Sequence, residues 1–374
     1  MARKCKGCGA VLQSENEQLP GFVPKSVIED TTKSDIVCKR CYRIKNYGSY
    51  EPVEITSDDY INEVKKVVND SNVVVFIIDL IDFESSMDEK LLQIIKNRPI
   101  IAAVNKIDLL PEKKHPSETA NWVKKRFAEY NIVPFDIAIL SVKDDYGVNG
   151  IVRKISYLFS NGAKAAVVGV TNVGKSSLIN GIIGGKSKVT VSKYPGTTLK
   201  AIFVEHPDKN HTFIDTPGLI PKGRASDLVC EECNLKMVPS KEITRKTFKI
   251  KEGKVLMIGG LINIQVVNTG EFLPIFQAFA AKDVTFHETN EIRAEELMKT
   301  KAGEFIIPPC EKCSEKYYNL KFIKKEFIVE EGEELCFKGL GWISVRRGPL
   351  ELVVTMPEEI DAVIRPALVA PKKY

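Results

Sequence analysis

Eight of the nine cysteines occur in four Cys-x-x-Cys pairs, a spacing typical of thiolates that bind a metal ion. The first two pairs are Cys5/Cys8 and Cys38/Cys41. Two intervening residues let both thiolates reach one ion from a tight turn, and two such turns complete a tetrahedral zinc site. A segment this short buries little core, so metal binding would supply its folding free energy. The alternatives are buried apolar cysteines or a redox pair; we predict structural zinc.

The other two pairs, Cys230/Cys233 and Cys310/Cys313, lie far apart in the sequence, so only the fold could join them. Joined, they would form a second zinc site, and the alternative is two unrelated loops. The ninth cysteine, Cys336, lies in a strand-like stretch and is expected in the core.

A phosphate-binding pattern follows an apolar stretch at residues 165–168, where we expect a strand. It reads Gly169-x-x-x-x-Gly174-Lys175-Ser176, the P-loop pattern in its strand–loop–helix context. The glycines let backbone N–H groups approach phosphate oxygens, Lys175 would pair with the β- and γ-phosphates, and Ser176 would hold Mg²⁺. The predicted nucleotide-binding residues of this loop are Gly169, Asn172, Val173, Gly174, Lys175, Ser176 and Ser177.

A base-recognition motif, Asn105-Lys106-Ile107-Asp108, follows another apolar stretch at residues 99–104. Guanine presents two adjacent N–H donors, which the Asp108 carboxylate can accept together, and adenine has no such pair. The motif resembles the guanine-reading motif of the Ras-like GTPase superfamily, whose Asn and Lys brace the site and cover the base. The resemblance also implies that Ser141-Val142-Lys143, after residues 135–140, contacts guanine O6; valine here replaces the superfamily's alanine.

Two further motifs resemble the switches of that superfamily. Asp215-Thr216-Pro217-Gly218 follows residues 212–214 and is similar to switch II, which implies that Asp215 holds Mg²⁺ through water and that the Gly218 N–H senses the γ-phosphate. Switch I is implied between the P-loop and this motif, with Thr198 as its threonine and Thr197 as the alternative. The predicted catalytic residues are therefore Lys175, Thr198, Asp215 and Gly218.

The order of the motifs indicates a circular permutation, because Ras-like proteins run from the P-loop through the switches to the guanine motifs. Here the guanine motifs come first and switch II comes last. A permutation can preserve the sheet, since the termini of such a domain lie close together. Switch II then directly precedes the C-terminal region, so we expect the nucleotide state to control the position of that region.

Two residues bear on hydrolysis of GTP to GDP. Leu219 follows Gly218 where Ras-type enzymes have a water-positioning Gln, so intrinsic hydrolysis is expected to be slow. Asn172 matches an asparagine that, in potassium-activated GTPases of similar sequence, helps to hold K⁺ between the α- and γ-phosphates. The alternative is that Asn172 only caps the loop.

Asp79 and Asp82 are expected in a strand-to-helix loop in which Ser85, Ser86 or Asp88 caps the next helix.

The elements around these motifs indicate an α/β nucleotide domain followed by a different module. Short β-branched stretches at 255–260, 262–267, 322–329 and 342–345, with a helix at 293–299, predict a β-rich or α+β region. Its Lys324-Lys325 and Arg346-Arg347 pairs could touch RNA, although solvated faces are the simpler interpretation.

The 374 residues are 44% hydrophobic and 28% charged, which excludes a mainly disordered, collagen-like or disulfide-scaffold chain. The longest apolar run, 73–78, is too short to span a bilayer, so a cytoplasmic protein is expected.

The net charge of +5 is concentrated at the N-terminus. Residues 1–50 carry +4, residues 51–219 carry 0 and residues 220–374 carry +1. Cations flank the first two cysteine pairs, which makes this module a candidate contact for RNA phosphates. These cations are Arg3, Lys4, Lys6, Lys39, Arg40, Arg43 and Lys45.

The whole order resembles one family, the YqeH-type bacterial GTPases. The resemblance rests on the Cys5-x-x-Cys8 start, the knuckle from Cys38 to Arg43, the permuted GTPase motifs and Phe337-x-Gly-Leu-Gly-Trp342. It implies three domains: a zinc module (1–50), a circularly permuted GTPase domain (51–219) and a C-terminal domain (220–374) similar to the tryptophan RNA-binding attenuation protein. It also implies a cytoplasmic factor for assembly of the small (30S) ribosomal subunit, with precursor rRNA or ribosomal proteins as partners and neither membrane nor DNA. The second pair of Cys-x-x-Cys motifs is outside this family pattern.

Overall fold

The computed structural model describes residues 3–17, 19–29, 36–39, 41–42, 57–112, 114–184, 200–268, 273–301 and 303–368. The chain forms two compact units. The first comprises Met1–Ile107 and His115–Pro221, and the second comprises Asp108–Lys114 and Lys222–Tyr374. The division into three domains, with boundaries at residues 50 and 219, stays a prediction.

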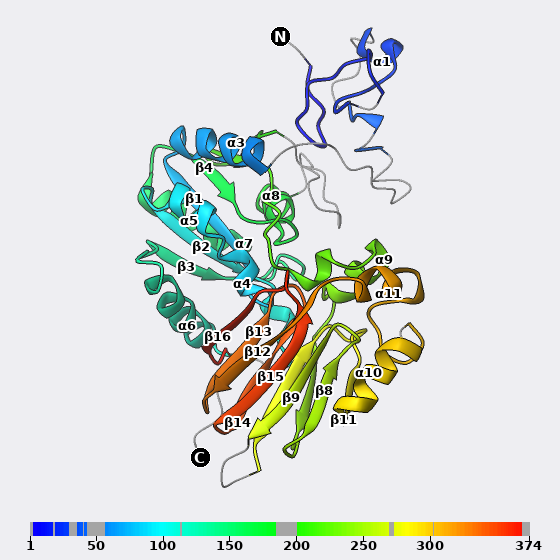
Figure 1. Cartoon of the computed structure of the whole chain (residues 1–374). Coiled ribbons are helices and arrows are strands. Elements are labelled where there is room, and N and C mark those ends of the chain that lie inside the picture. Colours follow the sequence, from blue (N-terminus) through cyan, green and yellow to red (C-terminus); the bar gives the residue numbers. More distant parts are fainter. Residues whose placement is uncertain are drawn as a thin grey trace. The chain divides into compact units, whose positions relative to one another are not determined.

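The first unit is built on a six-stranded sheet in the order β3-β2-β1-β4-β6-β5. Its strands are β1 (Val73–Asp79), β2 (Ile100–Asn105), β3 (Asp136–Ile139), β4 (Ala163–Val168), β5 (Ile202–Glu205) and β6 (His211–Asp215). Neighbouring strands run parallel, apart from the antiparallel β5–β6 pair. Every residue of β1 and β2 is buried, because helices cover both faces of a parallel sheet and long apolar runs therefore fill it (Figure 1).

Among the described residues of the first unit, two helices precede β1 and five others connect the strands. They are α1 (Lys25–Glu29), α3 (Ser57–Asn69), α4 (Phe83–Ser86), α5 (Glu89–Ile95), α6 (Pro116–Ala128), α7 (Val148–Leu158) and α8 (Lys175–Ile182). Asp88 caps α5 by accepting hydrogen bonds from the N–H groups of Lys90 and Leu91. Asp88 is one of the three residues predicted as a helix cap in this region. The central strand β4 leads into the P-loop, with the guanine-motif strands on one side and the switch II strand on the other. This arrangement confirms the predicted α/β fold with circularly permuted chain order.

The second unit contains two five-stranded antiparallel sheets, β16-β13-β14-β10-β7 and β11-β8-β9-β15-β12. The strands are β7 (Thr244–Phe248), β8 (Lys254–Ile258), β9 (Ile262–Asn268), β10 (Ile275–Ala280), β11 (Phe286–Asn290), β12 (Phe322–Val329), β13 (Glu333–Phe337), β14 (Gly341–Arg347), β15 (Leu350–Pro357) and β16 (Ala362–Pro366). Residues of both sheets share one core, for example Ile264 of β9 and Ile343 of β14. The helices are α9 (Glu231–Met237), α10 (Glu291–Thr300) and α11 (Glu311–Tyr318), with a 3₁₀ turn, η2, at Ala225–Asp227.

The predicted β-rich C-terminal region is confirmed, and all four stretches expected as strands are strands. The helix expected at 293–299 is the central part of α10. Six further strands and the short helices α9 and α11 were not anticipated. The buried Cys336 lies in β13, as expected for a core residue. None of the helices described by the structure is long and apolar enough to cross a membrane.

Candidate functional site

The P-loop spans the gap between the end of β4 and the start of α8, and two of its glycines are required by close contacts. A Cβ at Gly169 would lie 2.6 Å from the carbonyl oxygen of Ile77. A Cβ at Gly174, whose φ is +105°, would lie 2.6 Å from Nδ2 of Asn105. Only glycine combines this positive φ with so little room, so the loop can follow the path of a phosphate cradle.

Lys175 begins α8 and turns its ammonium group back into the loop. Its Nζ donates to the carbonyl oxygens of Gly169 at 3.0 Å and Val170 at 2.8 Å. Burial lowers the pKa of Lys175 to about 8, against the opposing attraction of the Asp215 carboxylate. A buried ammonium in a loop of backbone N–H groups is suited to pair with phosphate oxygens, as predicted for this residue.

Two of the three predicted Mg²⁺ ligands, Ser176 and Asp215, lie next to each other. Ser176 Oγ donates to Oδ2 of Asp215 at 2.7 Å, because α8 follows β4 and Asp215 ends the neighbouring strand β6. A hydroxyl and a carboxylate are the oxygen ligands that Mg²⁺ prefers, and these two residues could hold the ion with a nucleotide. Ser177 lies in the first turn of the same helix. Thr198 and Thr197 lie outside the described residues, so the switch I assignment stays a prediction.

Switch II lies against the P-loop. A Cβ at Gly218 would be 2.7 Å from Nζ of Lys175 and 3.1 Å from Cα of Thr171, so a side chain here would displace the Lys175 ammonium. The next residue, Leu219, forms a parallel bridge with Val170 and accepts a hydrogen bond from the Thr171 N–H at 2.9 Å. The end of switch II is therefore paired directly with the phosphate loop.

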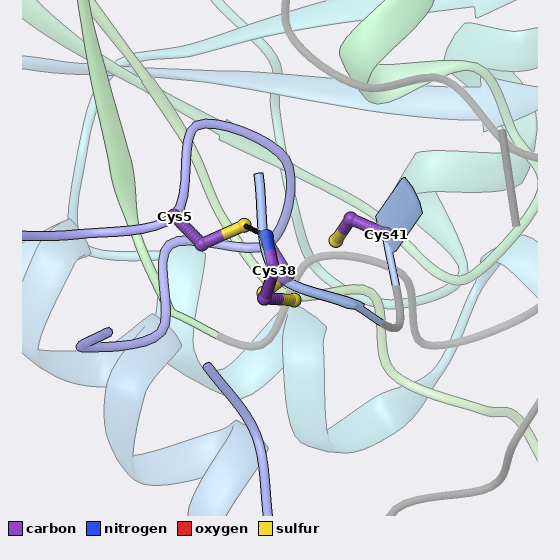
Figure 2. A group of neighbouring side chains, drawn as sticks. Cys5, Cys38 and Cys41 are labelled. Atoms are coloured by element: carbon purple, nitrogen blue, oxygen red, sulfur yellow. Dashed lines mark hydrogen bonds between the residues drawn. The ribbon is translucent and has the colours of Figure 1, made fainter. Parts of the chain in front are cut away.

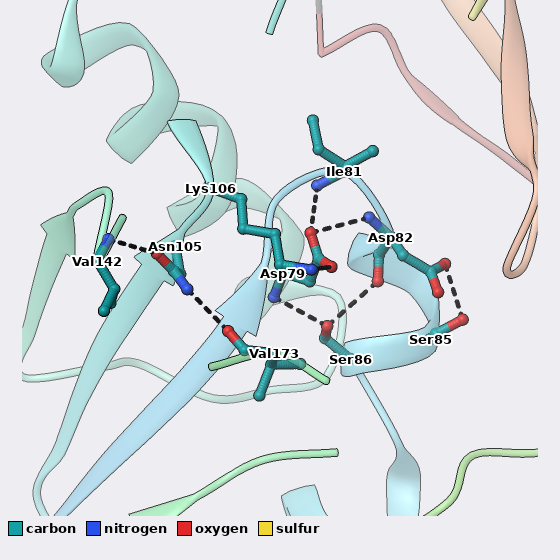
Figure 3. A network of polar contacts seen from close by, with 9 residues as sticks. All are labelled: Asp79, Ile81, Asp82, Ser85, Ser86, Asn105, Lys106, Val142 and Val173. Atoms are coloured by element: carbon teal, nitrogen blue, oxygen red, sulfur yellow. Dashed lines mark hydrogen bonds and ion pairs between the residues drawn. The ribbon is translucent and has the colours of Figure 1, made fainter. Parts of the chain in front are cut away.

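Asn105 joins the guanine motif to two other predicted segments. Its Nδ2 donates to the carbonyl of Val173 in the P-loop at 2.8 Å, and its Oδ1 accepts from the N–H of Val142 at 3.0 Å (Figure 3). Ser141 closes the turn that contains Val142 and Lys143: its Oγ donates to the Asp144 carboxylate and accepts from the Asp144 N–H, both at 3.2 Å. Segments separated by tens of residues thus meet at one edge of the sheet. Asp108 follows in the 3₁₀ turn Ile107–Leu109, and its guanine contact stays a prediction.

Asp79, predicted only as part of a strand-to-helix loop, belongs to this network. Its Oδ2 lies 2.5 Å from Nζ of Lys106, while its Oδ1 accepts from the Ile81 N–H at 2.9 Å (Figure 3). Lys106 has a φ of +71°, an uncommon conformation that directs its backbone through a tight turn. Asp79 is in register with Asn105 across β1 and β2, a pairing that no pattern in the sequence indicates.

The first four cysteines meet as predicted. Figure 2 shows three of them: Cys5 on one loop, and Cys38 and Cys41 on a second stretch of the N-terminal segment that is helical at Cys41. All four Sγ atoms lie within 4.8 Å of one another, and those of Cys8 and Cys38 are 3.7 Å apart. Cys5 Sγ accepts backbone N–H bonds from Gly7 at 3.3 Å and from Cys38 at 3.2 Å. Four buried sulfurs at this spacing could hold one tetrahedral metal ion.

The second four cysteines also form a group whose Sγ atoms lie within 4.8 Å of one another. The alternative of two unrelated loops is therefore wrong. All four residues belong to the second unit, two of them buried and two partly exposed.

Comparison with known proteins agrees with this arrangement. A family model described as "50S ribosome-binding GTPase" matches residues 164–259, and one described as "YqeH-like, C-terminal" matches residues 273–368. The Bacillus subtilis protein named "Uncharacterized protein YqeH" is 30% identical over 370 residues, which cover 98% of this chain and 99% of that protein. The chain belongs to the YqeH family.

Other relatives of this YqeH-family chain are similar over a smaller part. GTPase Der from Acetivibrio thermocellus is 29% identical over 229 residues, covering 54% of this chain and 49% of Der. The crystal structure of YjeQ from Thermotoga maritima matches 40% of this chain and 48% of its own, with 21% identity and a TM-score of 0.25. With the P-loop geometry, the family assignment identifies the chain as a GTPase that uses GTP or GDP with Mg²⁺.

Proposed function

We propose that this protein is a GTP-driven switch that assists assembly of the small ribosomal subunit in the cytoplasm. In the GTP state it would bind immature 30S particles through their rRNA or proteins, and hydrolysis would release it. The description of the family model that matches residues 164–259, "50S ribosome-binding GTPase", supports a ribosomal role, and the choice of the small subunit rests on the resemblance to YqeH-type GTPases. Neither a membrane nor DNA is a proposed partner.

The observation that carries the switch model is the pairing of Leu219 with Val170. Leu219 follows the switch II glycine, which lies against Lys175, and the second unit resumes at Lys222. A change at the γ-phosphate would therefore reach the chain entering the C-terminal unit within a few residues. This short path supports relay of the nucleotide state from switch II to that unit.

Two metals complete the proposal. The N-terminal cysteine group would hold structural zinc, and its surrounding cations would contact RNA phosphates. Lys6 and Lys39 belong to the described residues, whereas Arg40, Arg43 and Lys45 lie outside them. K⁺ would assist hydrolysis beside Asn172, whose φ of +65° places it at the turn of the P-loop.

Sedimentation with purified ribosomal subunits tests the proposed partner. The protein is mixed with 30S or 50S particles and with GTP, GDP or a non-hydrolysable GTP analogue. We expect co-sedimentation with 30S particles in the analogue state and at least tenfold less with GDP. Lys175→Met, which loses the phosphate-pairing ammonium, serves as the nucleotide-binding control. Equal association in all three nucleotide states would contradict the switch, and association with 50S particles alone would contradict the partner.

The second candidate is an RNA-binding scaffold with negligible hydrolysis. The buried Leu219 favours it, because an aliphatic side chain cannot orient the attacking water as a glutamine would. Single-turnover hydrolysis in K⁺ and in Na⁺ separates the two functions. Hydrolysis that is faster in K⁺, and that loses this dependence in Asn172→Ala, supports the switch; no hydrolysis in either salt supports the scaffold.

A further inference from the structure

We propose that Cys230, Cys233, Cys310 and Cys313 hold one structural zinc ion that joins the segment after switch II to the C-terminal sheets. The proposal concerns the second unit alone and does not depend on the proposed ribosomal function. Its starting point is that two pairs of thiols from separate parts of the chain converge.

The distances between sulfurs fit a single tetrahedral ion. A Zn–S bond of about 2.3 Å requires sulfurs about 3.8 Å apart at the corners of a tetrahedron. The observed separations are 3.5 Å for Cys230–Cys310, 3.8 Å for Cys310–Cys313 and 3.8 Å for Cys233–Cys313. The N-terminal group has the matching value of 3.7 Å for Cys8–Cys38.

Local structure presents the sulfurs for a ligand. Cys230 precedes α9 and Cys310 precedes α11, and neither side chain makes a capping hydrogen bond. The second cysteine of each pair lies in the first turn of its helix, so both sulfurs of a pair face the same point. The N–H of Cys310 donates to Sγ of Cys233 at 3.2 Å, which stabilises a thiolate of the opposite pair.

Other thiol chemistry fits less well. The sulfurs are too far apart for a disulfide, whose S–S bond is about 2.05 Å. An iron–sulfur cluster distributes its thiolates over several irons, which spreads the sulfurs further than one ion does. Soft thiolates in a tetrahedron favour zinc, and four protein ligands leave no open position for catalysis.

The ion would link two helices that pack on the same core. Met237 of α9 and Tyr317 of α11 are both buried in the core shared by the two sheets. Tyr317 Oη also donates to the carbonyl of Leu261 at 2.8 Å. Cys230 lies only eleven residues after Leu219. Zinc would therefore anchor the chain that follows switch II to these two sheets.

The charge around this group indicates a structural role. Glu231, Glu232 and Glu311 lie within or beside the two pairs, whereas cations flank the N-terminal group. A zinc ion with four thiolates carries a net charge of −2, so acidic neighbours make a nucleic-acid contact unfavourable here. Lys236 and Lys312 lie 2.8 Å and 3.8 Å from Glu232 and offset part of this charge.

Zinc stoichiometry of the purified full chain tests the proposal. Elemental analysis is expected to find two zinc ions per chain, and one in Cys230→Ser/Cys310→Ser. Cys5→Ser/Cys8→Ser should also retain one, while Cys336→Ala, which changes the cysteine outside both groups, should retain two. Zinc content that Cys230→Ser/Cys310→Ser leaves unchanged, or iron in place of zinc, would overturn the proposal.

A measurement on the unmodified chain covers the case in which the double variant fails to fold. Cys230 and Cys310 are partly exposed, so free thiols there would react with iodoacetamide, whereas zinc-bound thiolates are protected. Peptide mapping should find both residues unmodified until a chelator is added, and modified together with loss of one zinc. Modification of both before chelation, with the zinc content unchanged, would overturn the proposal.

Discussion

The ammonium group of Lys106 lies 2.5 Å from the carboxylate of Asp79, and their side chains are only 17% and 11% exposed. The two residues come from adjacent strand ends, β2 and β1, at the edge of the sheet where the P-loop also lies. The same carboxylate accepts a hydrogen bond from the Ile81 backbone. Asp79 therefore fixes the lysine of the guanine motif to the loop that follows β1.

Asp79→Asn should weaken nucleotide binding without unfolding the first unit. The amide can still accept the Ile81 N–H but no longer carries the charge that pairs with Lys106. For a largely buried pair we expect roughly tenfold weaker GDP binding. Titration of a fluorescent GDP analogue measures this. Asp82→Asn, which alters a neighbouring carboxylate bonded to Ser85, is the matched control. Unchanged affinity in Asp79→Asn would contradict a positioning role.

Asp108→Asn should change which base is bound. An amide can accept only one of guanine's two donors while its own NH₂ opposes the other, so GDP affinity should fall by about 100-fold or more. Xanthine has a carbonyl in place of the guanine amino group, and the new NH₂ could donate to it. Competition between GDP and xanthosine diphosphate measures the preference. Recovery of tight binding with xanthosine diphosphate also shows that the variant is folded; unchanged GDP affinity would contradict the guanine assignment.

The parts of the site that could be predicted are those encoded in local patterns. Long apolar runs identify the buried parallel strands, and the motifs stand at their ends, so the contacts of Ser176 with Asp215 follow from strand order. The Asp79–Lys106 pair could not be derived in this way, because it depends on the register of β1 with β2.

The C-terminal unit was less predictable for a related reason. In β15 buried and partly buried residues alternate over residues 350–356, but the apolar Val353 at a partly buried position obscures this pattern in the sequence. The short strand β16 pairs with β13, which is not its neighbour in the chain. The second cysteine group shows both cases together. Its spacing predicted metal ligands, whereas the meeting of Cys230 with Cys310 depends on the packing of α9 and α11.

Nucleotide binding should take up a proton near pH 8 because the pKa of Lys175 is about 8 before phosphate binds. Phosphate charge raises this pKa, so affinity should fall as the pH rises through 8, approaching about tenfold per unit. Burial also makes the stability of the nucleotide-free protein rise between pH 8 and the usual lysine pKa, since the unfolded chain then binds more protons.

Calorimetry in two buffers of different ionisation enthalpy measures this uptake. About half a proton per GDP is expected at pH 8 and about a tenth at pH 7. Lys175→Met should bind GDP more weakly and lose the pH-dependent uptake. Equal uptake at both pH values in the unmodified protein would contradict the assignment to Lys175.

A buried ion pair in the second unit provides a stability test. Arg365 of β16 lies opposite Glu334 of β13, 3.1 Å apart, and their side chains are 1% and 0% exposed. The Arg365 guanidinium also lies 5.5 Å from the ring of Trp342. Arg365→Met would remove the guanidinium that pairs with the buried Glu334 carboxylate, and breaking such a buried pair costs about 3–5 kcal/mol. Arg365→Met/Glu334→Leu should recover most of this loss, because the Glu334 carboxylate is then removed together with its partner.

Urea unfolding followed by Trp342 fluorescence in a Trp122→Phe background reports on this unit, since these are the two tryptophans of the chain. Lys321→Met is the matched control, because the Lys321–Glu358 pair has a similar short distance of 2.6 Å but is 72% and 43% exposed. Solvent screens such a pair, so its loss should cost no more than about 1 kcal/mol. Equal shifts in the unfolding midpoint for Arg365→Met and Lys321→Met would show that burial does not set the cost of breaking the Arg365–Glu334 pair.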